Sequence, residues 1–396
     1  MDYIISNKMK DVSGSMIREL FKLAKDPNMI KFGGGNPSEE SFPVKEIGEI
    51  SAKAFREEAV GMLQYGLSEG YTPLRETLKA KLSKEGIDFE NNDILIVSGA
   101  QQAADLSAKV LLNEGDGVIA EDPSFVGCLN TFRAYGAKLY GVALEDDGMD
   151  LNLLENTLKE NKNIKLMYVI PSFQNPTGFT TSLEKRRAIL DLAKKYNIII
   201  FEDNPYGELR FKGEDVRTIK SMDEEGRVIY AGSFSKVMAP AFRVGFMVIP
   251  KPLMQKMTVA KQTADVHTTV LFQHICNEYM TKYDYSAHIE KIRALYKHKA
   301  ELMVSSMEKY FHPDVRFSYP DGGLFVMAFL PNGIDSEVFV RKGIDNLVAC
   351  VPQVAFAIDQ SKKYSGFRMN YSSESDENIV KGVKILGQMT YDALKK

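Results

Sequence analysis

Short apolar runs alternate with amphipathic segments through the middle of the chain. The segments between the runs, such as Gln101–Leu112 and Leu183–Tyr196, repeat apolar residues at helical spacing. Runs rich in Ile and Val that alternate with helices are typical of a mostly parallel sheet covered by helices on both faces. We therefore expect an α/β fold with a seven-stranded sheet, whose strands are Ile94–Val97, Gly117–Ala120, Lys138–Val142, Leu166–Ile170, Ile198–Phe201, Val228–Tyr230 and Val244–Ile249.

The pattern changes near Tyr283–Asp284. A long helical pattern over about Ala287–Tyr310 follows, and then two strand-like runs, "VRFSYPDGGLFVMAFL" and "YSGFRMNYS", with glycine or proline breaks. A chain of 396 residues also exceeds what one hydrophobic core usually supports. We expect a large domain over residues 46–285, a smaller α+β domain over 286–396, and an N-terminal segment, 1–45, that returns to pack against the small domain and the substrate.

Polar residues follow three of the expected strands at the point where each strand ends. Ligands of open α/β sheets bind beyond the carboxyl ends of the strands. Each residue alone would fit a simpler structural role, as a turn, a helix cap or a surface lysine. Three such groups in succession indicate a site instead: Asn175 in "PSFQNPTG", Asp203 and Tyr206 in "EDNPYG", and Ser233, Ser235 and Lys236 in "AGSFSK".

These residue types suit a carbonyl compound that carries a pyridine ring and a phosphate. A lysine such as Lys236 can form an imine, and an aspartate such as Asp203 can keep a pyridine nitrogen protonated. Arg243, seven residues after Lys236, can bind a phosphate through two hydrogen bonds. The turn "SGAQQ" (98–102) opens the Gln101–Leu112 helix, so its free N–H groups also suit an anion.

The run "SFSKVMAPAFRVG" (233–245) matches the signature Ser-x-Ser-Lys-x-x-x-Pro-x-x-Arg-x-Gly. It occurs with "YGLSEGYTPLR" (65–75), "NPTG" (175–178), "DNPY" (203–206) and "FRMNYS" (367–372), in the same order as in the class I/II aminotransferases. The chain therefore resembles these aspartate-aminotransferase-like, fold-type-I enzymes from about Gly33 onward. Their cofactor is pyridoxal 5'-phosphate, and the resemblance implies the same cofactor here.

The resemblance also implies a role for each matching residue. Lys236 would hold the cofactor as a Schiff base and move the Cα proton, with Asp203 on the pyridinium and Tyr206 as a further catalytic residue. Phe125 would stack on the ring, although core packing is an alternative for it. The other implied cofactor-binding residues are Ser98, Gly99, Ala100, Gln101, Asn175, Tyr206, Ser233, Ser235, Arg243 and, from the second subunit of a homodimer, Tyr65. The implied substrate-binding residues are Arg368, Asn175, Gly34, Gly35 and Arg18.

The local sequence around the glycine segment and around Arg18 bears on the roles of these residues. Gly33–Gly35 lacks the GxxxxGK pattern of a phosphate loop, so we interpret it as a backbone wall close to the substrate. Arg18 lies in an amphipathic segment, "SMIRELFKLA", where an exposed helix arginine is the common outcome. The resemblance instead implies that Arg18 meets an acidic substrate side chain.

The segments "GGGNPSEESFP" (33–43) and "DVHTT" (265–269) look most like the branch of 2-aminoadipate, kynurenine and aromatic aminotransferases. We expect a ping-pong transfer from an L-amino acid to a 2-oxo acid such as 2-oxoglutarate. A β-lyase on the same site remains an alternative, because the same residues would bind the cofactor. A second alternative is the effector domain of a transcriptional regulator. We do not favour it, because only ~30 residues precede the first motif, which is too few for an independent DNA-binding domain.

The composition argues against several other classes of protein. The formal net charge is −3 and the isoelectric point is about 6.1, so we expect no nucleic-acid partner. No apolar run reaches the ~18 residues of a membrane helix, and the N-terminus lacks the apolar region of a secretory signal. Three cysteines far apart fit a reduced, cytoplasmic protein, and the five histidines form no metal-binding motif.

Overall fold

The computed structural model describes residues 3–10, 12, 26–331 and 333–395. Its main sheet has eight strands in the order β2-β9-β8-β7-β6-β3-β4-β5. All seven expected strands are present, and the eighth, β5, has two residues that pair with the end of β4. The bounds are β2 Asn92–Val97, β3 Gly117–Asp122, β4 Lys138–Glu145, β5 Gly148–Met149, β6 Ile164–Val169, β7 Ile199–Asp203, β8 Val228–Ser233 and β9 Gly245–Pro250.

The sheet is mostly parallel, as the alternation of strands and helices predicts. Strands β4, β3, β6, β7 and β8 pair in parallel. Strand β9 runs antiparallel to both of its neighbours, β8 and β2. Most strand residues are fully buried, because helices cover both faces of the sheet.

Alternate strand residues pack against different helices. Leu166 and Phe201 belong to one apolar cluster with α6 (Ala100–Leu111), α7 (Val126–Ala134) and α10 (Lys251–Gln262). Met167 and Ile200 belong to another with α8 (Leu151–Glu160) and α9 (Leu183–Tyr196). This alternation is the two-residue period of a strand with both faces buried.

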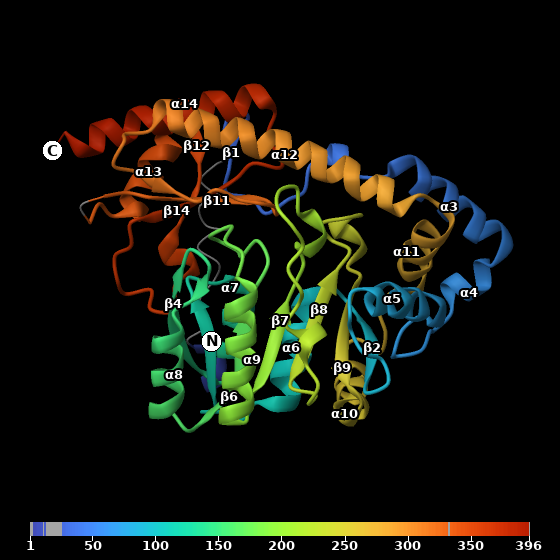
Figure 1. Cartoon of the computed structure of the whole chain (residues 1–396). Helices are drawn as coiled ribbons and strands as arrows, with labels where there is room; N and C mark the ends of the chain where they lie inside the picture. The colour runs from blue at the N-terminus through green and yellow to red at the C-terminus, as the bar shows by residue number, and fades with distance from the viewer. Residues whose placement is uncertain (1–2, 11, 13–25, 332, 396) are drawn as a thin grey trace.

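A second group of helices packs at the end of the sheet near β2 (Figure 1). Helices α5 and α11 contribute Leu74, Leu78 and Ile275 to the largest apolar cluster. Among the described residues, every helix is too short or too polar to span a lipid bilayer. The bounds of this group are α3 Val44–Glu57, α4 Ala59–Leu63, α5 Thr72–Lys84 and α11 Val270–Lys282; α1, Asn7–Lys10, lies near α7 instead.

A smaller α+β unit completes the fold. Its four-stranded antiparallel sheet has the order β10-β11-β14-β13. The long α12 packs along α14 and extends over the large sheet toward α11 (Figure 1). The elements are α12 Tyr285–Tyr310, β10 Arg316–Phe317, β11 Phe325–Phe329, α13 Ser336–Asp345, β12 Val348–Ala349, β13 Val351–Pro352, β14 Gly366–Asn370 and α14 Asp376–Leu394, and the 3-10 turns of the chain are η1 Glu39–Ser41, η2 Gly207–Leu209, η3 Lys220–Met222, η4 Pro240–Phe242 and η5 Gln353–Phe356.

The chain near its N-terminus joins this smaller unit. Strand β1, Ile30–Lys31, pairs in parallel with β12. The amide of Asn370 donates a hydrogen bond to the carbonyl of Phe32 at 2.7 Å. These contacts bring the glycines that follow Phe32 to the edge of the large sheet where β6, β7 and β8 end. The domain limits at residues 45 and 285 stay predictions.

Candidate active site

The polar residues that follow β6, β7 and β8 lie close to one strand of the smaller sheet. Asn175 follows β6, Asp203 ends β7 and Lys236 follows β8. Arg368 of β14 donates a hydrogen bond from Nη1 to Asn175 Oδ1 at 2.7 Å. The site therefore forms where the two sheets meet, at the carboxyl edge that the sequence predicts.

Lys236 presents its amine to the glycine segment. Its Nζ donates to the carbonyl of Gly35 at 2.6 Å. Burial lowers the pKa of Lys236 to about 8, and the positive charges of Arg368 and Arg243 act in the same direction. A lysine with a lowered pKa supplies more of its neutral amine, which is the nucleophilic form, near neutral pH.

Asp203 is buried, and only one of its two carboxylate oxygens has hydrogen-bond partners among the described residues. Its Oδ2 accepts a hydrogen bond from the Tyr168 hydroxyl at 3.0 Å and faces the Cys128 thiol at 3.9 Å. Its Oδ1 is buried and has no hydrogen-bond partner among the described residues. Burial raises the pKa of Asp203 to about 7, against the opposing effect of the two donors. A protonated ring nitrogen is the kind of partner that would complete the hydrogen bonding of this carboxylate.

Arg368 is a buried cation whose hydrogen bonds to the described residues all go to neutral groups. Besides Asn175, it donates from Nη2 to the carbonyl of Gly33 at 2.7 Å. Its guanidinium lies over the rings of Phe325 and Phe356, with the carbon 4.2 and 4.7 Å from their centroids. Its Nε has no partner in the described ranges. Burial lowers the pKa of Arg368 to about 10, so an anionic ligand would stabilise it strongly.

The start of α6 and the turn after β8 form a third part of the site. Arg243 donates to the carbonyl of Ser98 at 3.2 Å and to the Ser235 hydroxyl at 3.4 Å. Ser233 donates to the Ser235 hydroxyl at 3.0 Å. The first N–H groups of a helix lack acceptors within that helix, so Ala100 and Gln101 complete a set of donors that suits a phosphate.

Gly99 permits this arrangement. Its φ is +82°, and a Cβ there would lie 2.2 Å from Nη2 of Arg243. No side chain fits both the backbone conformation and the space. The glycine therefore allows the helix start and the arginine to face the same ligand.

The residues present fit pyridoxal 5'-phosphate. Lys236, Arg368 and Arg243 supply positive charge, and within the described part of the chain none forms a salt bridge with a carboxylate. Asp203 keeps one buried oxygen without a hydrogen-bond partner among the residues that the structure describes. An amine, a carboxylate for a ring nitrogen and a phosphate cradle are together what this cofactor needs.

Comparison with known proteins settles the family. The model of "Aminotransferase class I and II" matches residues 27–386. The chain belongs to the class I and II aminotransferases. It is 40% identical to aromatic-amino-acid aminotransferase 1 of Thermococcus litoralis, over 100% of this chain and 96% of the relative. It is 37% identical to the 2-aminoadipate transaminase of Thermus thermophilus, over 95% of this chain and 94% of the relative.

The structure of a relative shows the same fold. The kynurenine aminotransferase of Pyrococcus horikoshii superposes with a TM-score of 0.95 at 39% identity, over 99% of this chain and 98% of the relative. That structure was solved with the aminated form of the cofactor, PMP. The aminotransferase described here uses pyridoxal 5'-phosphate and transfers amino groups to 2-oxo acids.

The other expected site residues of the aminotransferase lie around this centre in different ways. Phe125 is half-buried at the start of α7 and packs against the apolar cluster that includes residues of α6, α7 and α10. Tyr206 is buried, with its ring edge-on to Phe325 at 5.8 Å. Gly34 lies beside Gly35, which borders Phe325. Tyr65 is 81% exposed and contacts His267 edge-on. Arg18 lies outside the described residues.

The side chains of Ser98 and Gln101 are already hydrogen-bonded to other residues. The Ser98 hydroxyl donates to Asp265 Oδ2 at 2.7 Å, so its proton is already engaged. The Gln101 side chain turns to α7 and donates to Thr131 at 2.7 Å. The N–H of Ser98 also donates, to Gln102 Oε1 at 2.8 Å, so both donors of Ser98 are already engaged. Gln101 would contribute to a phosphate through its backbone N–H rather than through its side chain.

Two buried residues that the sequence did not reveal, Tyr168 and Lys261, support the site residues through hydrogen bonds. Tyr168 lies inside an apolar run and has the pattern of an ordinary strand residue. Lys261 is fully buried, and its Nζ donates to Gln102, Asp265 and Thr268 at 2.8 to 3.0 Å. Asp265 and Thr268 also bond to the Ser98 hydroxyl, so Lys261 holds the turn at Ser98 in place through them. The helical spacing of Lys261 and Asp265 was the available signal.

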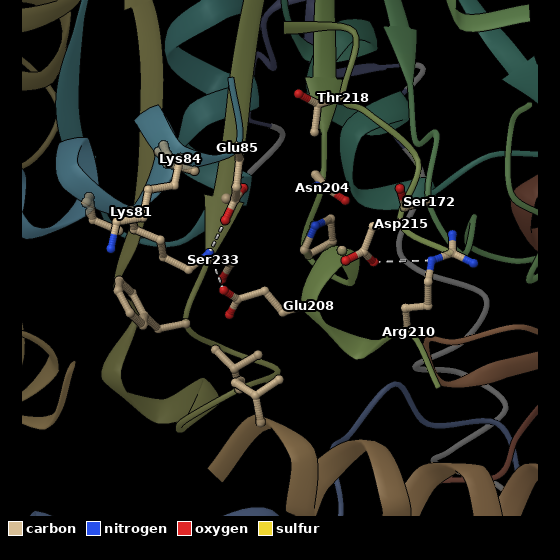
Figure 2. A pocket seen from close by; sticks show the side chains of 18 of the residues that line it. Lys81, Lys84, Glu85, Ser172, Asn204, Glu208, Arg210, Asp215, Thr218 and Ser233 are labelled. Atoms are coloured by element: carbon tan, nitrogen blue, oxygen red, sulfur yellow. Dashed lines mark hydrogen bonds and ion pairs between the residues drawn. The ribbon is translucent and has the colours of Figure 1, made fainter. Parts of the chain in front are cut away.

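A separate cavity of about 510 Å³ lies between α5, the segments after β7 and β8, and α12. Figure 2 shows Lys81 between Glu85 and Glu208 on one side, and Arg210 facing Asp215 on the other. Lys81 and Arg210 are thus already paired with carboxylates inside the cavity. The cavity borders Ser233. It differs from the Lys236 site, where the cations form no salt bridge with a carboxylate in the described ranges.

Proposed function

We propose that this enzyme is a broad-range amino-acid aminotransferase that accepts aromatic amino acids and 2-aminoadipate and uses 2-oxoglutarate as amino acceptor. The relatives named above act, by their names, on aromatic amino acids, 2-aminoadipate and kynurenine. The observation that carries the proposal is the buried Arg368, whose described hydrogen bonds all go to neutral groups. A carboxylate is common to every amino-acid and 2-oxo-acid substrate, and it would supply the missing anion.

Arg368 would fix the substrate carboxylate through its fork of N–H donors. The fork is held by Asn175 on one side and by the carbonyl of Gly33 on the other, so it is positioned before the substrate binds. The rings of Phe325 and Phe356 exclude water from it. An arginine prepared in this way binds a planar carboxylate at a small entropic cost.

Lys236 would move the proton. Its amine lies beside the glycine wall, and its lowered pKa leaves it able to accept a proton near neutral pH. Pyridoxal 5'-phosphate supplies a conjugated ring that takes up the electrons left when the Cα proton leaves. Asp203 would keep the ring nitrogen protonated, Asn175 and Tyr206 would hold the ring's 3-hydroxyl, and Phe125 would stack on the ring.

One site that serves both substrates in turn predicts ping-pong kinetics. The first amino acid leaves as a 2-oxo acid before the second 2-oxo acid enters. We infer that the acidic and the aromatic side chains of different substrates occupy the same space. The backbone of Gly34 and Gly35 would line one side of this space. Arg18 would meet the acidic side chains.

We also propose a homodimer with shared active sites. Tyr65 is 81% exposed in the single chain, although the family motif assigns it to a cofactor phosphate. A second subunit would cover this tyrosine and place it at the partner's site. The exposed apolar side chains Val60, Leu63 and Leu67 near Tyr65 support an interface there.

A panel of amino acids tests the function directly. The purified enzyme is mixed with each amino acid, and the absorbance of its bound cofactor is followed before and after 2-oxoglutarate is added. Aromatic amino acids and 2-aminoadipate should convert the cofactor, and 2-oxoglutarate should restore it. Turnover without any added 2-oxo acid, with release of a β-substituent, would instead show a β-lyase. No spectral response to any amino acid would contradict both activities.

A further inference from the structure

Tyr168 lies on the strand next to Asp203. In the sheet register Tyr168 of β6 is paired with Phe201 of β7, and Asp203 is two residues further along β7. Residues two apart on a strand share a face. The tyrosine side chain therefore reaches diagonally toward the carboxylate, and its hydroxyl lies 3.0 Å from Oδ2.

The ring of Tyr168 is held on two sides. It stacks on Phe201 at 5.8 Å with an interplanar angle of 24°, and it meets Phe132 edge-on at 5.6 Å. Its side chain is fully buried. Such packing fixes the position of the hydroxyl, so the direction of its hydrogen bond is set by the fold.

The hydroxyl of Tyr168 is a permanent donor. Burial, together with the nearby Cys128 and Asp203, raises the pKa of Tyr168 well above its ordinary value. The phenol therefore keeps its proton throughout the working range of an enzyme. Cys128 is a weaker second donor, because its sulfur is 3.9 Å from the same oxygen.

The remaining ionisable groups near Asp203 do not favour its charged form. Burial raises the pKa values of Glu121 of β3 and of Tyr206, just after β7, and the negative charge of Asp203 adds to both increases. Burial also favours the neutral acid. The hydrogen bond from Tyr168 is the main described contact that stabilises the carboxylate.

We propose that Tyr168 is a positioning residue that orients Asp203 and holds the shared proton on the ring nitrogen of the cofactor. By occupying Oδ2, it leaves Oδ1 as the oxygen for the ring. By stabilising the carboxylate, it disfavours transfer of the proton from the ring nitrogen to Asp203. This inference rests on the proposed function, because the ring nitrogen matters only if the cofactor binds at Lys236.

The state of the ring nitrogen can be read directly. The enzyme is loaded with pyridoxal 5'-phosphate labelled with ¹⁵N in the ring, and the nitrogen chemical shift reports its protonation. The substitution Tyr168→Phe removes only the hydroxyl. We expect the resonance to move toward the unprotonated position at any one pH, and kcat to fall by about tenfold, the equivalent of one pKa unit.

Tyr196→Phe is the matched control. It also removes one tyrosine hydroxyl, which bonds to Glu155 at 3.2 Å on the outer side of the molecule, away from the site. The control should keep the wild-type resonance and kcat. If Tyr168→Phe fails to fold, 3-fluorotyrosine at position 168 keeps the shape and makes the hydroxyl a stronger donor, so the resonance should move toward the protonated position.

The outcomes separate this proposal from the proposed function. If the wild type binds no cofactor at Lys236, the proposed function itself fails. If the wild type is loaded and active but the resonance is the same in the Tyr168 variants and in the control, the role of Tyr168 is refuted. A fall in kcat with an unchanged resonance would also refute it, because it would indicate a merely structural effect.

Discussion

Lys236, Arg368 and Arg243 bring three positive charges to one edge of the sheet. Their hydrogen bonds go to carbonyl, amide and hydroxyl oxygens, so each cation remains able to bind an anion. The charges also act on one another, since Arg368 and Arg243 help to lower the pKa of Lys236. The preference for anionic ligands and the reactivity of the lysine therefore have a common origin.

The lowered pKa of Lys236 gives a pH dependence to cofactor loading. Only the neutral amine attacks a carbonyl, and Lys236 is mostly neutral above a pH of about 8 and protonated below it. The rate at which cofactor-free enzyme binds pyridoxal 5'-phosphate covalently should fall about tenfold for each pH unit below that value. Stopped-flow absorbance measures this rate.

Two variants serve as checks on this prediction. Lys236→Ala should give no borohydride-reducible linkage at any pH. Arg368→Gln should shift the profile to higher pH, because one of the charges that lower the pKa is removed. A reducible linkage on a peptide without Lys236, or a rate independent of pH, would contradict the assignment of the lysine.

Arg368→Gln should also separate substrate binding from cofactor binding. A hydrogen bond to a charged group contributes about 1.5–3 kcal/mol, so kcat/KM for amino acids should fall by roughly 10- to 100-fold. The affinity for the cofactor should change little, since the described contacts of Arg368 are with Asn175 and the glycine wall. Steady-state kinetics and equilibrium dialysis give the two values. An equal loss in both would show that Arg368 supports the site as a whole.

At the scale of the elements, the start of α6 decides how the phosphate is held. Gly99→Ala would force a Cβ to within 2.2 Å of Arg243 and strain a backbone with φ of +82°. We expect weaker binding of the cofactor and a lower melting temperature. Gly48→Ala in α3 is the control, because its Cβ would meet nothing within 4 Å.

The control variant Gly48→Ala should change the melting temperature in the opposite direction. Alanine is favoured over glycine within a helix by about 0.5–1 kcal/mol, so Gly48→Ala should raise the melting temperature and keep the cofactor affinity. Calorimetry and fluorescence titration of both variants test the pair. Unchanged cofactor affinity in Gly99→Ala would contradict the proposed phosphate cradle.

The strands and the strand-end residues were predictable, but their mutual arrangement was not. Periodicity identified seven strands, yet it carries no direction, so the antiparallel course of β9 could not be foreseen. A two-residue strand such as β5 leaves no periodic signal. Asn175, Asp203 and Lys236 could be predicted as site residues because polar groups at strand ends stand out in the sequence, and the structure places them near one another.

The contact between Tyr168 and Asp203 could not be predicted from the sequence, because it depends on the register of two strands. Within "KLMYVI" Tyr168 has the features of a core residue, and its partner lies 35 residues later on another strand. Only the pairing of β6 with β7 brings the hydroxyl to the carboxylate. Supporting residues of this kind are defined by contacts between elements, and a single sequence does not contain them.

At the scale of the whole molecule, one chain leaves the side chain of Tyr65 largely exposed. The tyrosine is 81% exposed, and its described ring contact is with His267 of the same chain. Most soluble oligomers are symmetric dimers with self-complementary interfaces. In the proposed homodimer, the second copy of this chain would cover Tyr65, and Tyr65 would reach the cofactor phosphate at the partner's site.

Mixing two inactive variants tests this shared site. Tyr65→Ala and Lys236→Ala should each have little activity as homodimers. In a mixed dimer, the chain with Tyr65→Ala still contributes Lys236, and its partner contributes Tyr65, so one of the two sites is complete. At equal concentrations and full exchange, half of the dimers are mixed, and about a quarter of the wild-type activity should return. Exchange is followed with differently tagged chains. A mixture that exchanges subunits but regains no activity would contradict the shared site. Mixed dimers would then be present, and the site expected to combine Lys236 of one chain with Tyr65 of the other would be inactive.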